Sequence, residues 1–192
     1  MSQTAPDRRQ WVLSVLERYE VPLMRFAARM LGDEESAADA VQHVFLRLCE
    51  QSPDELRNRV APWLFSVCRN KTIDLLRSRG RNMSLAQAET MMSESKEPDP
   101  AATAERRELY DRLNLLVDRL PQNQREAVLL WSEGLSYFEI ARVVGRSEGA
   151  TRVMVHRAMK ALRASPAVGR LLEGKPADHP AVRRRLEKSP AP

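Results

Sequence analysis

The clearest hydrophobic pattern lies between residues 120 and 163, where three short amphipathic segments follow one another. The first predicted helix spans 124–131 and ends at Gly134, a residue type that tolerates the left-handed conformation after a helix. Ser136 begins the next helix, 137–144, with Glu139 at the spacing of a capping box. Helical spacing predicts that Ile140, Ala141 and Val144 face inward from this helix. The turn 145–147 leads into a third helix, capped by Ser147 and ending near 163. This order is typical of a helix-turn-helix DNA-binding motif.

The third helix has two different faces. Four of its residues share one narrow arc at 3.6 residues per turn and are expected to face the core: Thr151, Val155, Ala158 and Leu162. The side chains on the opposite arc are small and apolar near the N-terminal end of the helix and cationic further along. This order suits a helix in the major groove, where phosphates flank the base edges. The same basic face also fits a solvated surface on an ordinary three-helix bundle. The turn spacing and the two caps favour DNA binding.

Residues 8–81 carry a second series of amphipathic segments and predict one helical domain. Pro22 is expected to interrupt the first stripe and to open a new helix, which ends at Gly32. Asp33 is placed to cap a helix over 34–49. Residues 51–61 predict a loop that can hold a helical turn, and Pro62 and Gly80 are expected to begin and end the last helix.

Composition and charge indicate the fold class and how the two domains are connected. Charged residues make up 30% of the 192 residues and aromatic residues only 5%, which together with the helical periodicity predicts an all-α protein. We expect two small helical domains, 8–81 and 105–165, joined by an acidic flexible linker, 82–104, and followed by a mobile, basic, proline-containing tail, 166–192. Cations outnumber acids between 69 and 81, which favours a polyanionic partner at that face.

Other classes of site find little support in the sequence. Cys49 and Cys68 are too few for a disulfide framework or a four-cysteine zinc site, and both are expected to pack as small apolar residues. The three histidines are too scattered to predict a metal site. No catalytic constellation and no cofactor site is indicated. No stretch approaches the roughly 20 apolar residues of a membrane span, so we expect no membrane insertion and a cytoplasmic protein.

Two separated stretches resemble one family. GDEESAADAVQHVFLRL followed by APWLFSVCRNKTIDLLRSRGR is similar to region 2 of the extracytoplasmic-function (ECF) type of bacterial RNA polymerase sigma factor, within the sigma-70 family. LPQNQREAVLLWSEGLSYFEIARVVGRSEGATRVMVHRAMKALR is similar to region 4 of the same proteins. The resemblance covers about residues 8–165. It implies an alternative sigma factor that binds core RNA polymerase, directs it to specific promoters and promotes promoter melting without a catalytic site of its own.

The resemblance also implies roles for residues of the first domain. Those expected to bind core polymerase lie on the helix 34–49, where Phe45 equally fits a core position: Asp39, Gln42, Phe45, Leu46 and Arg47. Those expected at the minus-ten element and the melted strand lie in the preceding loop and on the last helix: Arg57, Asn58, Arg59, Trp63, Asn70, Lys71, Arg77, Arg79 and Arg81. The loop lacks the aromatic residue often found there in the family. Trp63 alone fits a core position better, but an aromatic residue among cations is what unpaired bases require.

In the second domain the resemblance implies contacts to the upstream promoter element from the turn and the last helix: Arg146, Ser147, Ala150, Arg152, Val153, Met154, Arg157 and Lys160. Val153 and Met154 stand where the family commonly has Ser and Arg, so fewer polar base contacts are expected. Ala150 and Val153 are available to thymine methyl groups, whereas the cations are expected to contact phosphates.

Core RNA polymerase and promoter DNA are thus the expected partners, and an anti-sigma factor is a further one because many relatives have such a partner. A stand-alone helix-turn-helix regulator, which binds duplex DNA without polymerase, is the main alternative. An enzyme with an appended DNA-binding domain is disfavoured because no catalytic constellation is found. An adaptor that binds polymerase but not DNA is disfavoured by the basic segment 69–81.

Overall fold

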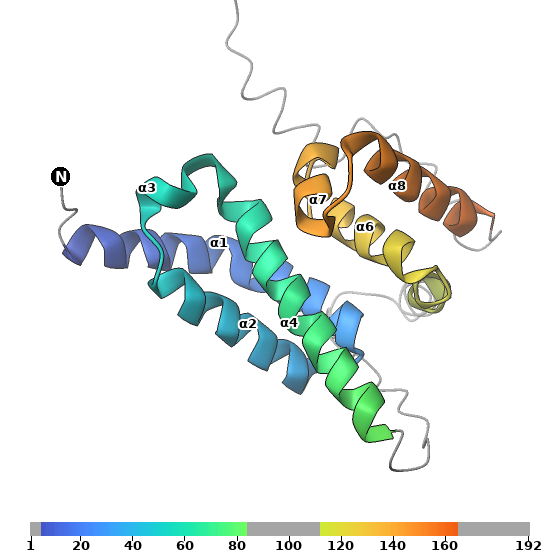
Figure 1. The fold of residues 1–192 in the computed structure, drawn as a ribbon, viewed down its shortest axis with the longest axis horizontal. Helices are drawn as coiled ribbons and strands as arrows, with labels where there is room; N and C mark the ends of the chain where they lie inside the picture. The colour runs from blue at the N-terminus through green and yellow to red at the C-terminus, as the bar shows by residue number, and fades with distance from the viewer. Residues whose placement is uncertain (1–4, 84–111, 165–192) are drawn as a thin grey trace, which may run out of the picture. The chain divides into compact units, whose positions relative to one another are not determined.

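The computed structural model describes residues 5–83 and 112–164, and every regular element in these ranges is a helix (Figure 1). The chain divides into two compact units, one reaching to Ser95 and the other beginning at Lys96. The all-α, two-domain prediction is therefore confirmed. The predicted linker, apart from its first two residues, and the predicted tail lie outside the described residues.

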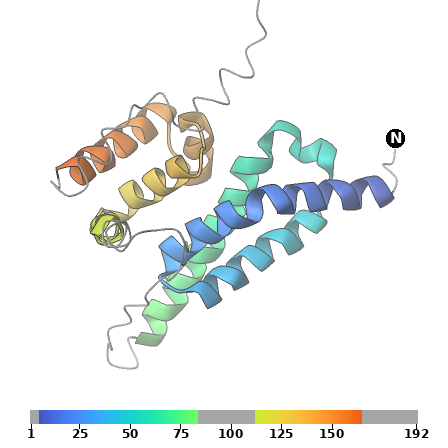
Figure 2. The same cartoon turned by 180° about the vertical axis from the view of Figure 1, so that it is seen from behind.

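The first unit is built from three long helices and a short connection. They are α1 (Ala5–Leu31), α2 (Glu34–Cys49), α3 (Pro53–Leu56), the 3-10 turn η1 (Arg57–Arg59) and α4 (Val60–Met83). The helices α1, α2 and α4 pack against one another, and Figure 2 shows α1 running along α2 and across α4. At the centre, the rings of Phe26 and Phe65 meet edge to face with their centroids 5.7 Å apart. Such a contact adds to the burial of apolar surface in holding two helices together.

The prediction that Pro22 opens a new helix is wrong, because α1 continues through it. A proline inside a helix removes one backbone hydrogen bond at a cost of about 3 kcal/mol. Apolar side chains on both sides of Pro22 are buried, among them Val15, Leu23 and Phe26. The packing of one continuous apolar stripe on α2 and α4 offsets the local cost.

The turn between α1 and α2 forms as predicted. Gly32 has a φ of +78° and follows the last residue of α1, and Asp33 caps α2 by accepting a hydrogen bond from the Ser36 backbone N–H. At the other end of the unit the predicted boundaries of α4 are wrong. The helix begins at Val60, before Pro62, and it continues through Gly80 to Met83. The predicted loop 51–61 contains α3 and η1.

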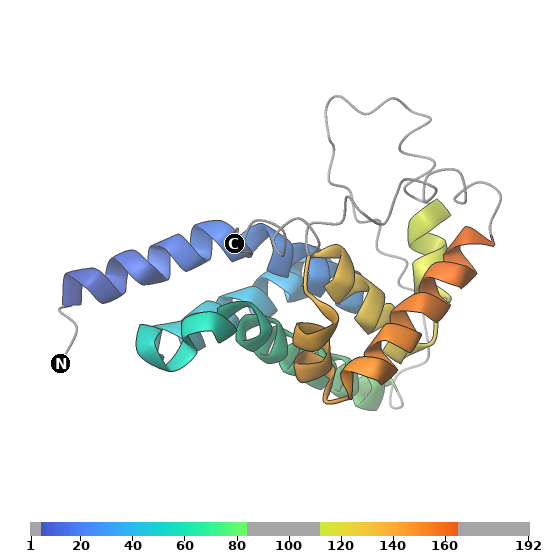
Figure 3. The same ribbon diagram turned by 90° about the horizontal axis from the view of Figure 1, so that it is seen from above.

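The second unit contains helical residues 112–118 and the helices α6 (Gln122–Ser132), α7 (Tyr137–Val144) and α8 (Glu148–Arg163). Figure 3 shows the chain passing from α7 through a short turn into α8. The capping box is present, since the Ser136 N–H donates to the Glu139 carboxylate at 2.8 Å and the Glu139 N–H donates to the Ser136 hydroxyl. Gly145 adopts the left-handed conformation at the end of α7, with a φ of +70°. The predicted capping box and the predicted turn after α7 are therefore confirmed.

The core of the second unit lies between α6, α7 and α8, which pack against one another. It contains Leu130 and Ile140, both fully buried. Val143 is buried on α7, whereas Val144, which we expected to face inward, is half-exposed. Glu126 is buried as well and accepts a hydrogen bond from the Gln122 side chain at 3.0 Å.

Candidate nucleic-acid and polymerase interfaces

The two faces of α8 lie as the sequence predicts. The four residues expected in the core are buried: Thr151, Val155, Ala158 and Leu162. The opposite face is exposed along the whole helix: Ala150, Val153, Arg157 and Lys160. Met154 is half-buried beside this face, and Arg146 and Ser147 are exposed in the preceding turn. The exposed surface of α8 is therefore small and apolar at its N-terminal end and cationic further along.

The cations near this face differ in their surroundings. Arg152 donates to the Glu148 carboxylate at 3.2 Å, and its guanidinium lies over the Tyr137 ring at 5.4 Å from the centroid. Within the described part of the chain, the side chains of Arg146, Arg157 and Lys160 have no hydrogen-bond or ion-pair partner. These three are the cations that can bind an external anion without first leaving an internal partner.

Ser147 serves the local structure of the turn. Its hydroxyl accepts a hydrogen bond from the Ala150 N–H at 3.2 Å and so caps α8. Its carbonyl accepts from the buried Thr151 hydroxyl at 3.0 Å. These bonds fix the first turn of α8, so that the exposed backbone at 148–150 has a defined position.

On α2, four of the five residues predicted to bind polymerase are exposed. Asp39, Gln42 and Arg47 are exposed, and Leu46 is 61% exposed although it is a large apolar residue. Phe45, for which two interpretations remained open, is half-buried. Leu46 and part of Phe45 therefore offer apolar surface among these polar side chains.

The connection between α2 and α4 holds three of the predicted minus-ten residues. Arg57, Asn58 and Arg59 are all exposed, and Arg57 has a φ of +28°, which is unusual for a residue with a side chain. Arg59 donates to the Glu55 carbonyl at 2.7 Å, and Arg57 lies 3.7 Å from the Asp54 carboxylate. The connection is thus a defined turn that carries cations on its surface.

The predicted minus-ten residues of α4 lie in different environments. Asn70 is exposed, and Trp63 and Lys71 are half-buried. The Arg77 side chain is 72% exposed and lies 3.8 Å from the Asp74 carboxylate. The side chain of Arg81 is outside the described residues.

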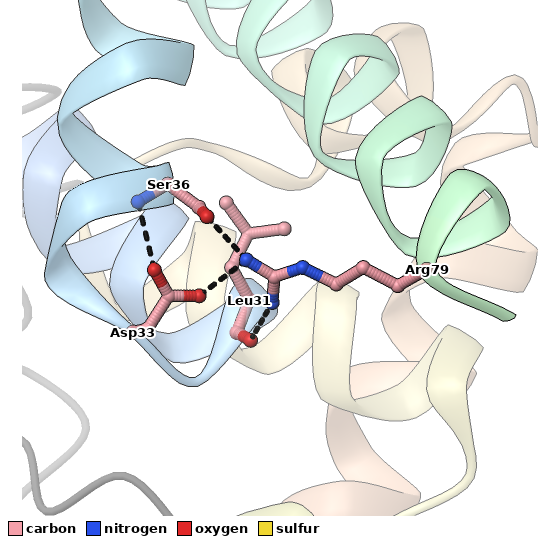
Figure 4. A network of polar contacts seen from close by, with 4 residues as sticks. All are labelled: Leu31, Asp33, Ser36 and Arg79. Carbon is pink, nitrogen blue, oxygen red and sulfur yellow. Dashed lines mark hydrogen bonds and ion pairs between the residues drawn. The ribbon is translucent and has the colours of Figure 1, made fainter. Parts of the chain in front are cut away.

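Arg79 has intramolecular partners from two other helices (Figure 4). Its guanidinium donates to the Leu31 carbonyl at 3.0 Å, to the Asp33 carboxylate at 2.6 Å and to the Ser36 hydroxyl. Partial burial raises the pKa of Asp33, but hydrogen bonds from Ser36 and Arg79 outweigh this effect and leave the pKa below its ordinary value of 3.8. Asp33 is therefore held as a carboxylate between the α2 cap and the α4 guanidinium.

The cysteines differ from each other. Cys68 is fully buried, and this burial raises the pKa of its thiol to about 12, so it packs as a small apolar residue as expected. Cys49 is the last residue of α2 and is exposed, so the same expectation is wrong for it. In the described ranges, no group of three His, Cys, Asp or Glu residues is arranged to hold a metal ion. None of the described helices is both long and apolar enough to span a membrane.

The described helices match known families in the same order. Residues 15–82 match the family Sigma-70 region 2, and residues 110–162 match the family Sigma-70, region 4. The ECF RNA polymerase sigma factor SigL of Mycobacterium tuberculosis is 35% identical over 158 residues, which cover 78% of this chain and 85% of SigL. The chain belongs to the sigma-70 family, in its ECF group. Proteins of this group direct RNA polymerase to promoters.

Other relatives support the same assignment. SigE of Mycolicibacterium smegmatis is 30% identical over 141 residues, which cover 72% of this chain but only 55% of SigE. Two solved structures are similar in fold. The sigma factor RpoE of Bartonella quintana, in complex with the anti-sigma factor NepR, matches 82% of this chain and 95% of RpoE with a TM-score of 0.66 at 24% identity. CnrH, in complex with the cytosolic domain of CnrY, matches 81% of this chain and 87% of CnrH with a TM-score of 0.55 at 25% identity.

Two residues that the sequence did not single out lie beside Arg152 at the exposed face of α8. Glu148 and Tyr137 surround Arg152 and occupy its guanidinium. The Glu148–Arg152 pair has the i, i+4 spacing of a helical ion pair and was therefore recognisable in the sequence. The contact with Tyr137 depends on the packing of α7 on α8, which local spacing does not reveal.

Proposed function

We propose that this ECF sigma factor uses three surfaces in turn. The exposed face of α2 binds core RNA polymerase, the exposed face of α8 binds the upstream promoter element, and α4 with the preceding turn holds the melted minus-ten strand. The observation that carries the proposal is the division of α8 into a fully buried face and an exposed face that is apolar and then cationic.

At the upstream element, the first turns of α8 enter the major groove. Ala150 and Val153 are exposed and small, and they provide apolar contact for thymine methyl groups. Arg157 and Lys160 contact phosphates, together with Arg146 from the turn. Such contacts set the position of the helix on the duplex but do not distinguish bases. Arg152 contributes less to phosphate binding because Glu148 neutralises it.

At the minus-ten element, the cations of the turn and polar residues of α4 bind the melted strand. Arg57, Asn58 and Arg59 lie exposed in the turn, and Asn70 and Lys71 follow on α4. Trp63 is half-buried and offers part of its ring for base stacking. Melting requires no chemical step from these residues, because binding unpaired bases more tightly than paired ones shifts the promoter toward its open state.

On α2, the exposed Leu46 and its polar neighbours form the polymerase contact. Leu46 supplies apolar surface, and the exposed Asp39, Gln42 and Arg47 of the same helix supply the polar part of the interface. Phe45 is half-buried, so part of its ring is available to the same contact. The protein has no catalytic site of its own, and it acts in the cytoplasm, where RNA polymerase works.

An anti-sigma factor is a further proposed partner. Two solved structures of similar fold are complexes: the sigma factor RpoE is bound to the anti-sigma factor NepR, and CnrH is bound to the cytosolic domain of CnrY. A partner of this class would compete with polymerase for the protein, and co-purification from its source cell followed by mass spectrometry would identify it.

Run-off transcription tests the main proposal. Purified protein is added to bacterial core polymerase with a pool of promoters from the same genome. We expect initiation from a defined subset of promoters that core polymerase alone does not use. Tight binding to duplex DNA by the protein alone, without initiation and without comigration with core polymerase, would instead identify a stand-alone regulator.

A further inference from the structure

Arg79 joins the three long helices of the first unit at one point. Its partners are the last residue of α1, the cap of α2 and the first turn of α2, although Asp33 lies 46 residues away in the sequence. The planar guanidinium presents several donors in a fixed arrangement, so simultaneous bonds to three groups define the orientation of the arginine closely. We call Leu31, Asp33, Ser36 and Arg79 the helix clamp (Figure 4).

The clamp uses both oxygens of one carboxylate. One oxygen of Asp33 accepts from the Ser36 backbone N–H at 2.8 Å and caps α2, and the other accepts from Arg79 at 2.6 Å. The start of α2 and the end of α4 are thereby attached to the same side chain. The clamp also explains why α4 continues through Gly80, since Arg79 holds the last turns of the helix against the α1–α2 turn.

Arg79 differs in this respect from its neighbour Arg77. The Arg77 side chain is 72% exposed with one partner on its own helix, whereas Arg79 is 40% exposed and bonds to two other helices. Binding of Arg79 to a phosphate would require these charge-assisted hydrogen bonds to break, and it would leave Asp33 without its cation. Binding of Arg77 to a phosphate has no comparable cost.

We infer that Arg79 is a positioning residue that couples the polymerase-binding helix α2 to the minus-ten face of α4, and that it is not a DNA contact. The inference rests on the proposed function of these two helices. When polymerase binds α2, the helix clamp fixes the position of α4 relative to α2. Asn70 and Lys71 then contact the melted strand without a rearrangement of α4. Such preorganisation raises the affinity for the strand without adding a contact to it.

The test uses the full chain assembled with core polymerase and a fork-shaped promoter DNA whose minus-ten region is unpaired. Four variants are compared with the wild type: Arg79→Gln, Asp33→Asn, the double variant and Arg77→Gln as the matched control. Three quantities are measured: the affinity of each protein for core polymerase, the affinity of each holoenzyme for the fork, and the salt dependence of fork binding. Circular dichroism establishes a temperature at which every variant is folded.

We expect Arg79→Gln and Asp33→Asn each to lower fork affinity about fivefold to tenfold, a size typical of the net loss of one hydrogen bond. The double variant should fall no further, because either change opens the same clamp. Affinity for core polymerase and the salt slope should stay at the wild-type values. Arg77→Gln should instead lower the salt slope by about 0.7, as expected for one phosphate contact on a single strand.

Two results would overturn the inference. If Arg79→Gln lowers the salt slope while Asp33→Asn leaves fork affinity unchanged or raises it, Arg79 contacts DNA directly. If both variants weaken core binding as much as fork binding, the clamp stabilises α2 only and does not couple it to α4.

Arg79→Lys replaces Arg79→Gln in the test if Arg79→Gln does not fold, because lysine keeps the charge but cannot bond to all three partners. The clamp predicts reduced fork affinity for Arg79→Lys, and a phosphate contact predicts wild-type affinity. Failure of the wild-type holoenzyme to bind the fork would refute the proposed function itself.

Discussion

The roles proposed for the two kinds of exposed residue on α8 can be separated by Arg157→Ala and Val153→Ala. Arg157 is exposed and has no side-chain partner among the described residues, so its removal leaves no internal group unsatisfied. We expect the unfolding free energy of Arg157→Ala to stay within about 0.5 kcal/mol of the wild type, as for most surface substitutions. Any larger effect on promoter binding then reports a contact with DNA.

The size of that effect follows from counterion release. One phosphate contact on duplex DNA contributes about 0.9 to the slope of the logarithm of the binding constant against the logarithm of the salt concentration. Between 50 and 200 mM salt, one such contact accounts for a decrease of about 3.5-fold in the binding constant. The Arg157→Ala holoenzyme should therefore bind more weakly at low salt, and its affinity should fall about 3.5-fold less than that of the wild type across this range.

The assay is equilibrium binding of holoenzyme to a library of promoters that vary at the upstream element, at several salt concentrations. Arg157→Ala should weaken all sequences to a similar extent, whereas Val153→Ala should change the preference at one base position and keep the salt slope. Arg152→Ala is the matched control, because Glu148 already neutralises Arg152, and its slope should change less than that of Arg157→Ala. A change in base preference with no loss of overall affinity for Arg157→Ala would refute this division of roles.

Three further predictions concern stability. Asp33→Asn keeps the oxygen that caps α2 but removes the negative charge. Because folding lowers the pKa of Asp33 below 3.8, the carboxylate stabilises the fold above pH 3.8 and loses this effect as the pH falls through the lowered pKa. Denaturation over a pH series should therefore show a less stable variant at pH 7 and a vanishing difference at the acid end, and a constant difference would contradict the assignment. Gly145→Ala should cost about 1 kcal/mol because φ is +70°, while the helical Gly149→Ala should be neutral or stabilising by up to about 1 kcal/mol; equal thermal shifts would show that the turn conformation is unimportant. Leu130→Ala, at a fully buried position, should cost about 2–5 kcal/mol in thermal or urea unfolding, and Leu115→Ala, at an exposed one, should cost much less.

The sequence by itself determined the elements whose partners lie close along the chain. The capping box joins Ser136 and Glu139, which are three residues apart, and the cap of α8 joins Ser147 to the third residue after it. The buried face of α8 followed from helical periodicity alone, because its four core residues lie within one narrow arc. These signals involve only residues that are close in the sequence, so they can be recognised without the tertiary structure.

Periodicity was less decisive where a helix packs on two neighbours. On α7 it favoured Val144, but Val143 is buried, because α6 and α8 both contact this short helix. It did not single out Phe65, which contacts Phe26 from α1 at the centre of the first unit. The position of a residue on a helix gives its direction, but only the neighbouring helices decide which directions are buried.

The tertiary structure alone decided where long helices continue and which cations remain available. Pro22 and Gly80 are residues that commonly interrupt or end helices, yet α1 and α4 pass through both, because packing on neighbouring helices and the helix clamp outweigh the local preference. The sequence likewise assigned Arg79 to the same basic edge as Arg77, since both are arginines near the end of one helix. Only the fold brings Asp33 to Arg79, because a contact between residues 46 positions apart depends on how α1, α2 and α4 pack and not on any local pattern.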